Sequence, residues 1–246
     1  MLRVTAVLTA LAFSAGFFAP APNAAAQDVA LDFTYASAYY WRGAPAGDGN
    51  GFLQPSADIS YAASPELSVG LNLWMSQGPE ASEAEDDSNS EIDYTVWAAY
   101  SAGEIGVYAG VIDYVIPAGA PFADGHVLEG HVGVDFAAGD LGLGVAAYLN
   151  LDGDDEDSMY IAPSLSYPLG NLSLGLSIGL GNGVYSAEEE GEEDAMALVD
   201  LTPSVSYAVP LGDEMEAAVG LAIGYNPDTG ATLPFLTFGT GWSWSP

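Results

Sequence analysis

The stretch LSLGLSIGL, residues 172–180, alternates without a break between large aliphatic and small side chains. In a β-strand Leu172, Leu174, Leu176, Ile178 and Leu180 would share one face, whereas a helix would scatter them around its circumference. The segment therefore predicts a strand with one bulky apolar face and one face of serine and glycine.

The same period-two pattern recurs about a dozen times after residue 27, in segments close to the roughly 9–11 residues that a tilted strand needs to cross a bilayer. The bulky faces, one of which includes Val199, carry no charge. Near Asp113 the frame stays open, because a β-bulge there would turn that carboxylate inward. The acids and the histidine on the opposite, small faces are predicted to line the interior: Asp32, Asp58, Asp93, Glu129, His131, Asp135 and Asp200.

The connections between these segments alternate in length. Short turns at 64–66, 102–104, 137–140, 168–171 and 210–214 alternate with longer, mostly acidic loops at 44–51, 77–90, 117–125, 152–158, 183–195 and 226–232. Tight turns at one end and long loops at the other are typical of bacterial outer-membrane barrels. We therefore predict an all-β fold, a single transmembrane antiparallel up-and-down β-barrel of about 12 strands over residues 27–246, with both termini in the periplasm.

A soluble β-sandwich is the alternative fold, because its strands alternate too. A sandwich fills a core with its inward faces and carries charge on its outward faces. Here a uniform aliphatic face opposes one made largely of glycine, serine and alanine, which favours lipid outside and a restricted polar interior.

Residues 1–26 have the features of a cleaved secretory signal peptide. Arg3 supplies the charged start, an apolar run follows, and three alanines precede Gln27 as a small-residue cleavage site. The rest of the chain then holds 34 acidic residues and one basic side chain, Arg42. With so little positive charge to neutralise phosphates, we expect no nucleic-acid partner. Such acidity is tolerable at high salt, which makes a halophilic source plausible.

Aromatic side chains fall near the predicted strand ends, where amphipathic rings suit the lipid headgroup region. This predicted girdle contains Tyr39, Trp41, Tyr61, Tyr94, Tyr100, Tyr167, Tyr207, Tyr225, Trp242 and Trp244. Tyr40 and Arg42 are one residue out of phase with it, so we expect them inside the barrel near its outer mouth. The carboxylate that would pair with Arg42 is left open.

Three stretches, SAYYWRG at 37–43, LQPSADISY at 53–61 and GVIDYVIP at 110–117, resemble the TorF-like family of outer-membrane porins. The resemblance implies an outer-membrane β-barrel that acts as a channel. The chain departs from such barrels at its C-terminus, where Trp244-Ser-Pro246 replaces a final aromatic residue.

No group of residues in the sequence specifies catalysis, a metal or a cofactor. Carboxylates are so numerous that no pair marks a glycosidase. His126 and His131 are the only histidines, and no nucleophile elbow surrounds a serine, so a hydrolase is weakly supported. The acidic run that starts at Asp152 lacks glycine at the sixth position and glutamate at the twelfth position of a calcium-binding loop.

These observations predict a non-enzymatic, passive diffusion channel for small solutes. Inward carboxylates would repel anions and concentrate cations, so we expect a cation preference. The expected partners are outer-membrane lipid and small solutes. The alternative is a non-conducting structural or adhesion barrel with acidic external loops, and an outer-membrane lipid hydrolase comes third.

Overall fold

The computed structural model describes residues 27–46, 51–79, 90–115, 126–154, 158–187 and 195–244. The expected signal peptide, the last two residues and positions 155–157 lie outside these ranges. Among the described residues, no helix is long and apolar enough to cross a membrane. The strands are β1 (Gln27–Ala36), β2 (Tyr39–Trp41), β3 (Ala44–Ala46), β4 (Phe52–Ala62), β5 (Leu67–Gln77), β6 (Ser90–Ala102), β7 (Ile105–Val115), β8 (His126–Ala138), β9 (Leu141–Asp152), β10 (Met159–Leu169), β11 (Leu172–Gly181), β12 (Ala197–Pro210), β13 (Met215–Tyr225) and β14 (Thr232–Trp244), with a 3₁₀ helix η1 (Gly183–Tyr185).

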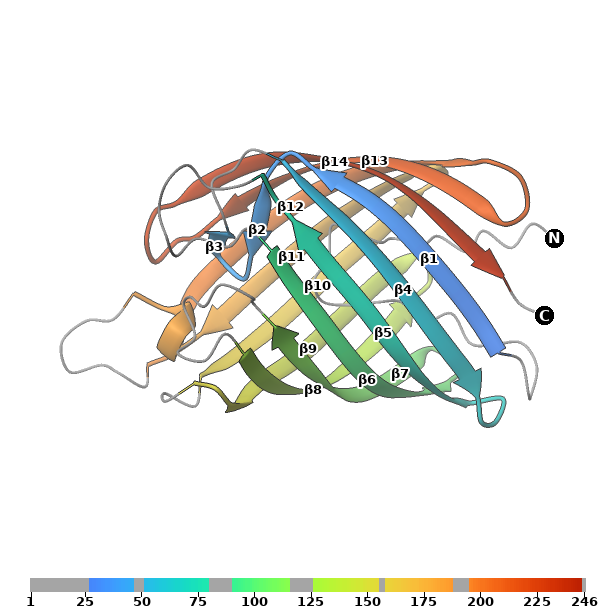
Figure 1. Cartoon of the computed structure of the whole chain (residues 1–246), viewed down its shortest axis with the longest axis horizontal. Coiled ribbons are helices and arrows are strands. Elements are labelled where there is room, and N and C mark those ends of the chain that lie inside the picture. The colour runs from blue at the N-terminus through green and yellow to red at the C-terminus, as the bar shows by residue number, and fades with distance from the viewer. Residues whose placement is uncertain are drawn as a thin grey trace.

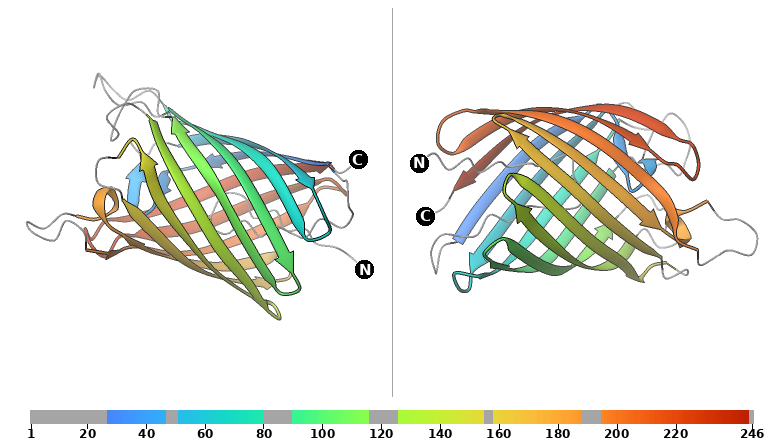
Figure 2. Two further views of the ribbon diagram at one scale, coloured as in Figure 1. Left: turned by 90° about the horizontal axis from the view of Figure 1, so that it is seen from below. Right: turned by 180° about the vertical axis from the view of Figure 1, so that it is seen from behind.

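The strands other than β2 and β3 form one closed antiparallel barrel of 12 strands (Figures 1 and 2). Each of these strands pairs with its neighbours in the chain, and the small β2–β3 hairpin lies in the connection between β1 and β4. Strand β1 pairs with β14 to close the ring, from Val29 opposite Trp244 to Ala36 opposite Thr237. Closure leaves no unpaired strand edge, as a bilayer requires. The predicted up-and-down barrel fold is confirmed.

The two ends of the barrel differ as the connection lengths predict. Figure 1 places the start of β1 and the end of β14, the two terminal strands of the barrel, at one end, and β2 and β3 at the opposite end. The terminal end carries the tight turns, of which three start with a glycine in the left-handed region, at φ 65° for Gly103, 66° for Gly139 and 66° for Gly170. Glycine at the first turn position is what a two-residue hairpin connection of type II′ needs. We call this the turn end and the opposite one the loop end.

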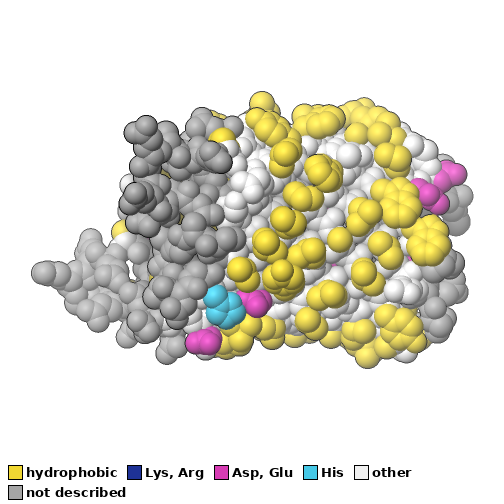
Figure 3. All heavy atoms as spheres, viewed as in Figure 1, with side chains coloured by type: hydrophobic (Ala, Val, Ile, Leu, Met, Phe, Trp, Pro, Cys, Tyr) yellow, Lys and Arg dark blue, Asp and Glu magenta, His cyan; other side chains and the backbone are white. Residues whose placement is uncertain are grey.

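The outer face of the barrel is an apolar band (Figure 3). Val96 is 62% exposed and Phe238 60%, values that suit contact with hydrocarbon rather than with a protein core. Apart from the exception on β12 described below, the two sides of the strands therefore divide as predicted. Most of the predicted girdle lies exposed on this outer face: Tyr61, Tyr94, Tyr100, Tyr167, Tyr207, Tyr225 and Trp244. Trp242 is half-buried and donates its indole N–H to Glu214 at 3.3 Å.

Two girdle assignments are wrong. Tyr39 and Trp41 do not continue β1, which ends at Ala36, but belong to the separate hairpin β2–β3 that folds into the barrel interior. Tyr39 is 8% exposed, and Trp41 packs against the buried core. The alternation of aromatic residues runs on through this segment, so its period alone could not separate the hairpin from the wall.

The strand registers settle the facing of Asp113, which the sequence leaves open, and correct that of Val199, which is predicted to face outward. β7 pairs with both neighbours without a bulge, so Asp113 stays on the outer face, where its Oδ1 lies 2.6 Å from Nδ1 of His126. A register shift in the β11–β12 pair lies next to Val199, which is fully buried instead of facing outward. Bulges re-aim side chains in this way.

Candidate functional site

The centre of the site is the tip of the β2–β3 hairpin. Trp41 pairs with Ala44, which leaves Arg42 and Gly43 as the turn, with φ of 47° and 92°. Two positive φ values are the signature of the type I′ turn that matches strand twist. Arg42 is the only non-glycine among the described residues with positive φ, a conformation that costs about 1–3 kcal/mol.

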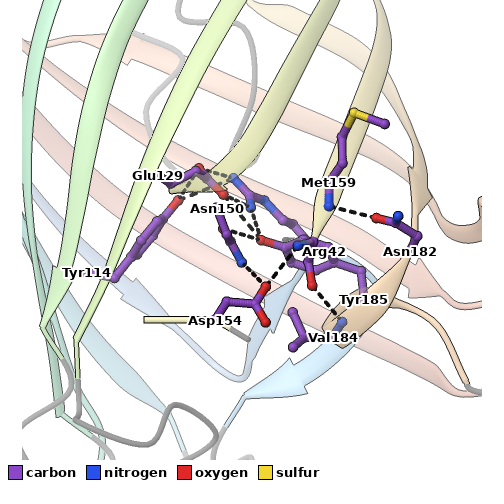
Figure 4. Close-up of polar contacts among 10 residues, drawn as sticks. Arg42, Tyr114, Glu129, Asn150, Asp154, Met159, Asn182, Val184 and Tyr185 are labelled. Carbon is purple, nitrogen blue, oxygen red and sulfur yellow. Dashed lines mark hydrogen bonds and ion pairs between the residues drawn. The ribbon is translucent and has the colours of Figure 1, made fainter. Parts of the chain in front are cut away.

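Arg42 is bound to the opposite wall of the barrel (Figure 4). Its Nη2 donates to Glu129 Oε1 at 2.8 Å, and its Nη1 forms an ion pair with Oε2 of the same carboxylate. Nη1 also donates to the Tyr185 hydroxyl at 2.6 Å and Nη2 to the Tyr114 hydroxyl at 3.2 Å. Both tyrosine hydroxyls lie within hydrogen-bond distance of Glu129, so the pair and the two phenols form one network.

Aromatic rings surround the same guanidinium. The Arg42 Cζ lies 4.2 Å from the ring centroid of Tyr148, 4.8 Å from Trp41, 5.0 Å from Tyr160 and 5.3 Å from Tyr185. All four are within the range of cation–π attraction. Together with Glu129 they form what we call the Arg42 cage: Trp41, Glu129, Tyr148, Tyr160 and Tyr185.

The cage is closed to water, and this shifts the pKa values of Arg42 and Tyr185. Arg42 is 4% and Glu129 0% exposed. Burial alone lowers the pKa of Arg42, but Tyr114, Tyr185 and Glu129 raise it by more than burial lowers it. The resulting pKa is well above the ordinary value of an arginine. Burial also raises the pKa of Tyr185 to about 12, so its hydroxyl remains neutral at physiological pH.

The rest of the hairpin contacts the other sides of the barrel. The ring of Tyr39 lies 5.8 Å from Phe52 of β4 and 5.7 Å from Trp74 of β5, and that of Tyr40 stacks at 6.3 Å on Phe235 of β14. At the tip, Asn226 donates its side-chain amide to the Gly43 carbonyl at 3.0 Å. The hairpin thus spans the interior from one wall to the other.

Glycine is required at the tip because the chain there touches the wall. A Cβ on Gly43 would lie 2.1 Å from the carbonyl oxygen of Val199, the residue displaced by the β12 irregularity. A β-bulge next to a functional site is a recurring device for placing backbone and side chains. Here it brings the β12 backbone under the tip.

The small inner face of the wall accommodates aromatic rings instead of leaving an open lumen everywhere. A Cβ on Gly70 would lie 2.3 Å from Trp97, one on Gly133 2.2 Å from Tyr108, and one on Gly179 2.2 Å from the Tyr160 hydroxyl. The glycines therefore let these rings lie flat against the neighbouring strand. This correlation between glycine and inward aromatic residues is a signal that the alternation pattern did not reveal.

The predicted inward acids do point inward, but into two different environments. At the loop end, Asp93, Glu129 and Asp200 are buried, and Asp200 accepts hydrogen bonds from Tyr160 at 3.0 Å and Thr202 at 2.6 Å. The Asp93 carboxylate oxygens have no hydrogen-bond partner among the described residues.

At the turn end the inner face is more open to solvent. Asp32 and Asp58 are half-buried there, amid half-buried serine, glycine and alanine, and Asp58 accepts the Trp97 indole N–H at 3.2 Å. Glu216 lies across from Gly241, which in turn lies across from Asp32, so these acids share one region of the wall. Asp135 is an exception at this end, because it is buried, with an exposed fraction of 9%. The interior is therefore packed with aromatic residues toward the loop end and lined by small and acidic residues toward the turn end.

The two histidines lie apart, one inside the barrel and one on its outer face. The His131 ring lies 6.1 Å from Tyr108 and 5.8 Å from Tyr148, and its Nδ1 has no hydrogen-bond partner among the described residues. His126 is on the outer face beside Asp113. Within the described ranges, no three histidine or acidic side chains are placed to hold a metal ion. Asp154 of the acidic run instead accepts hydrogen bonds from Asn150 and Ser158.

The sequence predicts that Arg42 lies inside the barrel, but it does not predict most of the residues around it. Glu129 was expected in the interior, but Tyr114, Tyr148, Tyr160 and Tyr185 were not recognised as its companions. The contacts of Arg42 with Glu129 and with these tyrosines join residues far apart in the chain; Glu129, for example, lies 87 positions from Arg42. Only the Arg-Gly pair beside a short aromatic run indicates the turn itself.

Comparisons with known proteins support the fold. A scan against models of protein families finds no match, and neither does a search of curated protein sequences. Among solved structures, the COG4313 outer membrane channel from Pseudomonas putida F1 is similar with a TM-score of 0.57 and 14% identity, covering 95% of this chain and 100% of that one.

Two further structures are similar at comparable levels. The KdgM porin in complex with disordered oligogalacturonate has a TM-score of 0.53 and 10% identity, covering 87% of this chain and 99% of that one. Outer membrane phospholipase A from Escherichia coli has a TM-score of 0.51 and 11% identity, covering 92% of each. This protein therefore has the closed-barrel fold of bacterial outer-membrane proteins, with its apolar face toward the lipid.

Proposed function

We propose that this protein is an outer-membrane channel for small solutes and that it prefers cations. The β2–β3 hairpin narrows this channel at the loop end of the barrel. The similar folds of an outer membrane channel and of KdgM support the channel class. The hydrolase alternative loses support because His131 packs between tyrosine rings and its Nδ1 has no hydrogen-bond partner among the described residues.

The observation that carries the cation preference is the charge of the inner face. Asp32, Asp58, Asp135 and Asp200 point into a barrel whose single basic side chain, Arg42, is already neutralised by Glu129. The interior therefore carries excess negative charge, which attracts cations and repels anions.

The alternative, a non-conducting structural barrel, is favoured by a different observation. The hairpin contacts β4, β5, β8 and β14, and the rings around Arg42 are buried. A barrel filled in this way at its loop end would pass few ions until the hairpin moves.

Reversal potentials of the purified protein in planar bilayers under a salt gradient test the proposal. We expect discrete conductance with a reversal potential on the cation side. The double variant Asp58→Asn, Glu216→Gln should shift that potential toward zero because it removes two inward charges. The matched control is Asp140→Asn, which removes an exposed charge from a turn at the same end of the barrel.

A folded barrel that shows no current, in the wild type and in hairpin variants alike, would support the structural alternative. A channel with unchanged selectivity in the double variant would retain the channel class and overturn the role of these two acids.

A further inference from the structure

The Arg42 cage has the composition of a receptor for an organic cation. Aromatic rings that enclose a cation are a recurring way to recognise alkylammonium and guanidinium groups. A carboxylate that accepts two parallel N–H bonds adds selectivity for guanidinium, because the planar fork matches its two oxygens. Glu129 binds both terminal nitrogens of Arg42 in this manner.

We infer that the cage is the solute site of the channel, that it takes organic cations bearing a guanidinium group, and that Arg42 occupies it as a tethered competitor. This inference rests on the proposed channel function and names its solute class.

Most of the cage belongs to the wall and not to the hairpin. Glu129 lies on β8, Tyr148 on β9, Tyr160 on β10 and Tyr185 on η1, and only Trp41 moves with the hairpin. Contacts within the wall also orient the rings, since the Tyr160 hydroxyl donates to Asp200 at 3.0 Å and that of Tyr185 lies 3.4 Å from Asn150 Oδ1. A site built on the wall persists when the hairpin leaves.

Arg42 is an imperfect occupant of the site. It holds φ at 47°, in the strained left-handed region, and its buried Nε has no hydrogen-bond acceptor among the described residues. The strands that carry it, β2 and β3, are three residues each, and so short a hairpin has little stability of its own. A free solute cation has neither the strained backbone nor the fixed direction of approach.

Charge balance selects the class of solute that can replace Arg42. Glu129 is fully buried, so an empty cage would leave both of its carboxylate oxygens without the guanidinium nitrogens that they now bind. A neutral or anionic solute cannot correct this, whereas a guanidinium restores the pair. Binding of such a solute would therefore shift the population toward the state with the hairpin displaced.

Calorimetric titration of detergent-solubilised protein with ethylguanidinium tests the inference, with ethylurea as the neutral ligand of matched shape. We expect Arg42→Ala, which empties the cage, to bind ethylguanidinium at least ~10-fold more tightly than the wild type, because the tethered side chain acts at a high effective concentration. Ethylurea should bind neither protein.

Two variants in the Arg42→Ala background locate the site. Glu129→Gln should abolish binding, and Tyr148→Leu should weaken it, since this ring is nearest the guanidinium. The matched control is Tyr108→Leu, a buried tyrosine beside His131 that should leave affinity unchanged. Folding of each variant is checked by the shift between boiled and unboiled protein on a detergent gel. If Arg42→Ala does not fold, the titration is performed on Arg42→Gln.

The outcomes separate the inference from the channel proposal. Equal affinity for ethylurea and ethylguanidinium, or binding that survives Glu129→Gln, would overturn the cage as a guanidinium site. Conductance in potassium chloride without ethylguanidinium binding would retain the channel and reject the solute class. Binding without conductance in any variant would retain the site and reject the channel.

Discussion

At the scale of single residues, Arg42 and Glu129 form a buried ion pair in which each side chain compensates the charge of the other, away from water. The contribution of this ion pair to folding stability depends on both partners. A buried ion pair stabilises the fold little more than an apolar pair does, but the loss of one partner leaves the other charge buried at a large cost in free energy. The hairpin therefore depends on both residues together.

We predict that Glu129→Gln lowers the free energy of unfolding by about 3–5 kcal/mol, since it leaves the Arg42 guanidinium buried without a counter-charge. Urea unfolding in detergent, followed by tryptophan fluorescence, measures the change. The double variant Arg42→Gln, Glu129→Gln is the control and should lose less than the sum of the two single variants. Additive losses would show that the two side chains do not act as a pair.

At the scale of elements, the β2–β3 hairpin is positioned by contact between its tip and β12. Gly43 and Gly103 both have positive φ, at 92° and 65°, but only at Gly43 would a Cβ meet the wall, since the surroundings of Gly103 are open. The two glycines allow the cost of backbone strain to be separated from the cost of displacing the tip.

We predict that Gly43→Ala raises single-channel conductance in planar bilayers, because the added methyl group pushes the tip off the Val199 carbonyl. Gly103→Ala should cost about 1–3 kcal/mol for the same kind of backbone strain and leave conductance unchanged. Equal conductance of the two variants would mean that the hairpin does not restrict the path.

At the scale of the whole molecule, the barrel separates a bulky apolar outside from an inside of small, aromatic and acidic side chains. On β6 the neighbours Val96 and Thr95 face opposite ways, Val96 being 62% exposed and Thr95 half-buried on the inner side. The membrane position of the barrel follows from this division.

We predict that Val96→Arg lowers stability in lipid vesicles by about 2–4 kcal/mol, the cost of a cation near the bilayer centre. Thr95→Arg places the same side chain on the inner face among carboxylates and should cost less. Folding titrations in urea with both variants measure the difference. A larger loss for Thr95→Arg would reverse our assignment of the two faces.

Much of this architecture could be predicted from local sequence, and the limits of that prediction have physical causes. Strand faces, turn positions and barrel closure follow from alternation, which every strand repeats. Tyr39 and Trp41 were misassigned because a hairpin inside the barrel alternates in the same way as the wall. Val199 was misassigned because one extra residue in β12 reverses the parity. The cage requires contacts between distant strands, which no local pattern contains.

The order in which the protein can assemble follows from the reach of the hairpin. Arg42 comes early in the chain, yet its contacts lie 72, 87 and 143 positions away, at Tyr114, Glu129 and Tyr185. Those contacts cannot form until the far wall exists, so docking of the tip belongs among the last events of maturation. The indole of Trp41, 5.9 Å from the ring of Tyr114, is therefore a built-in optical reporter of when assembly is complete.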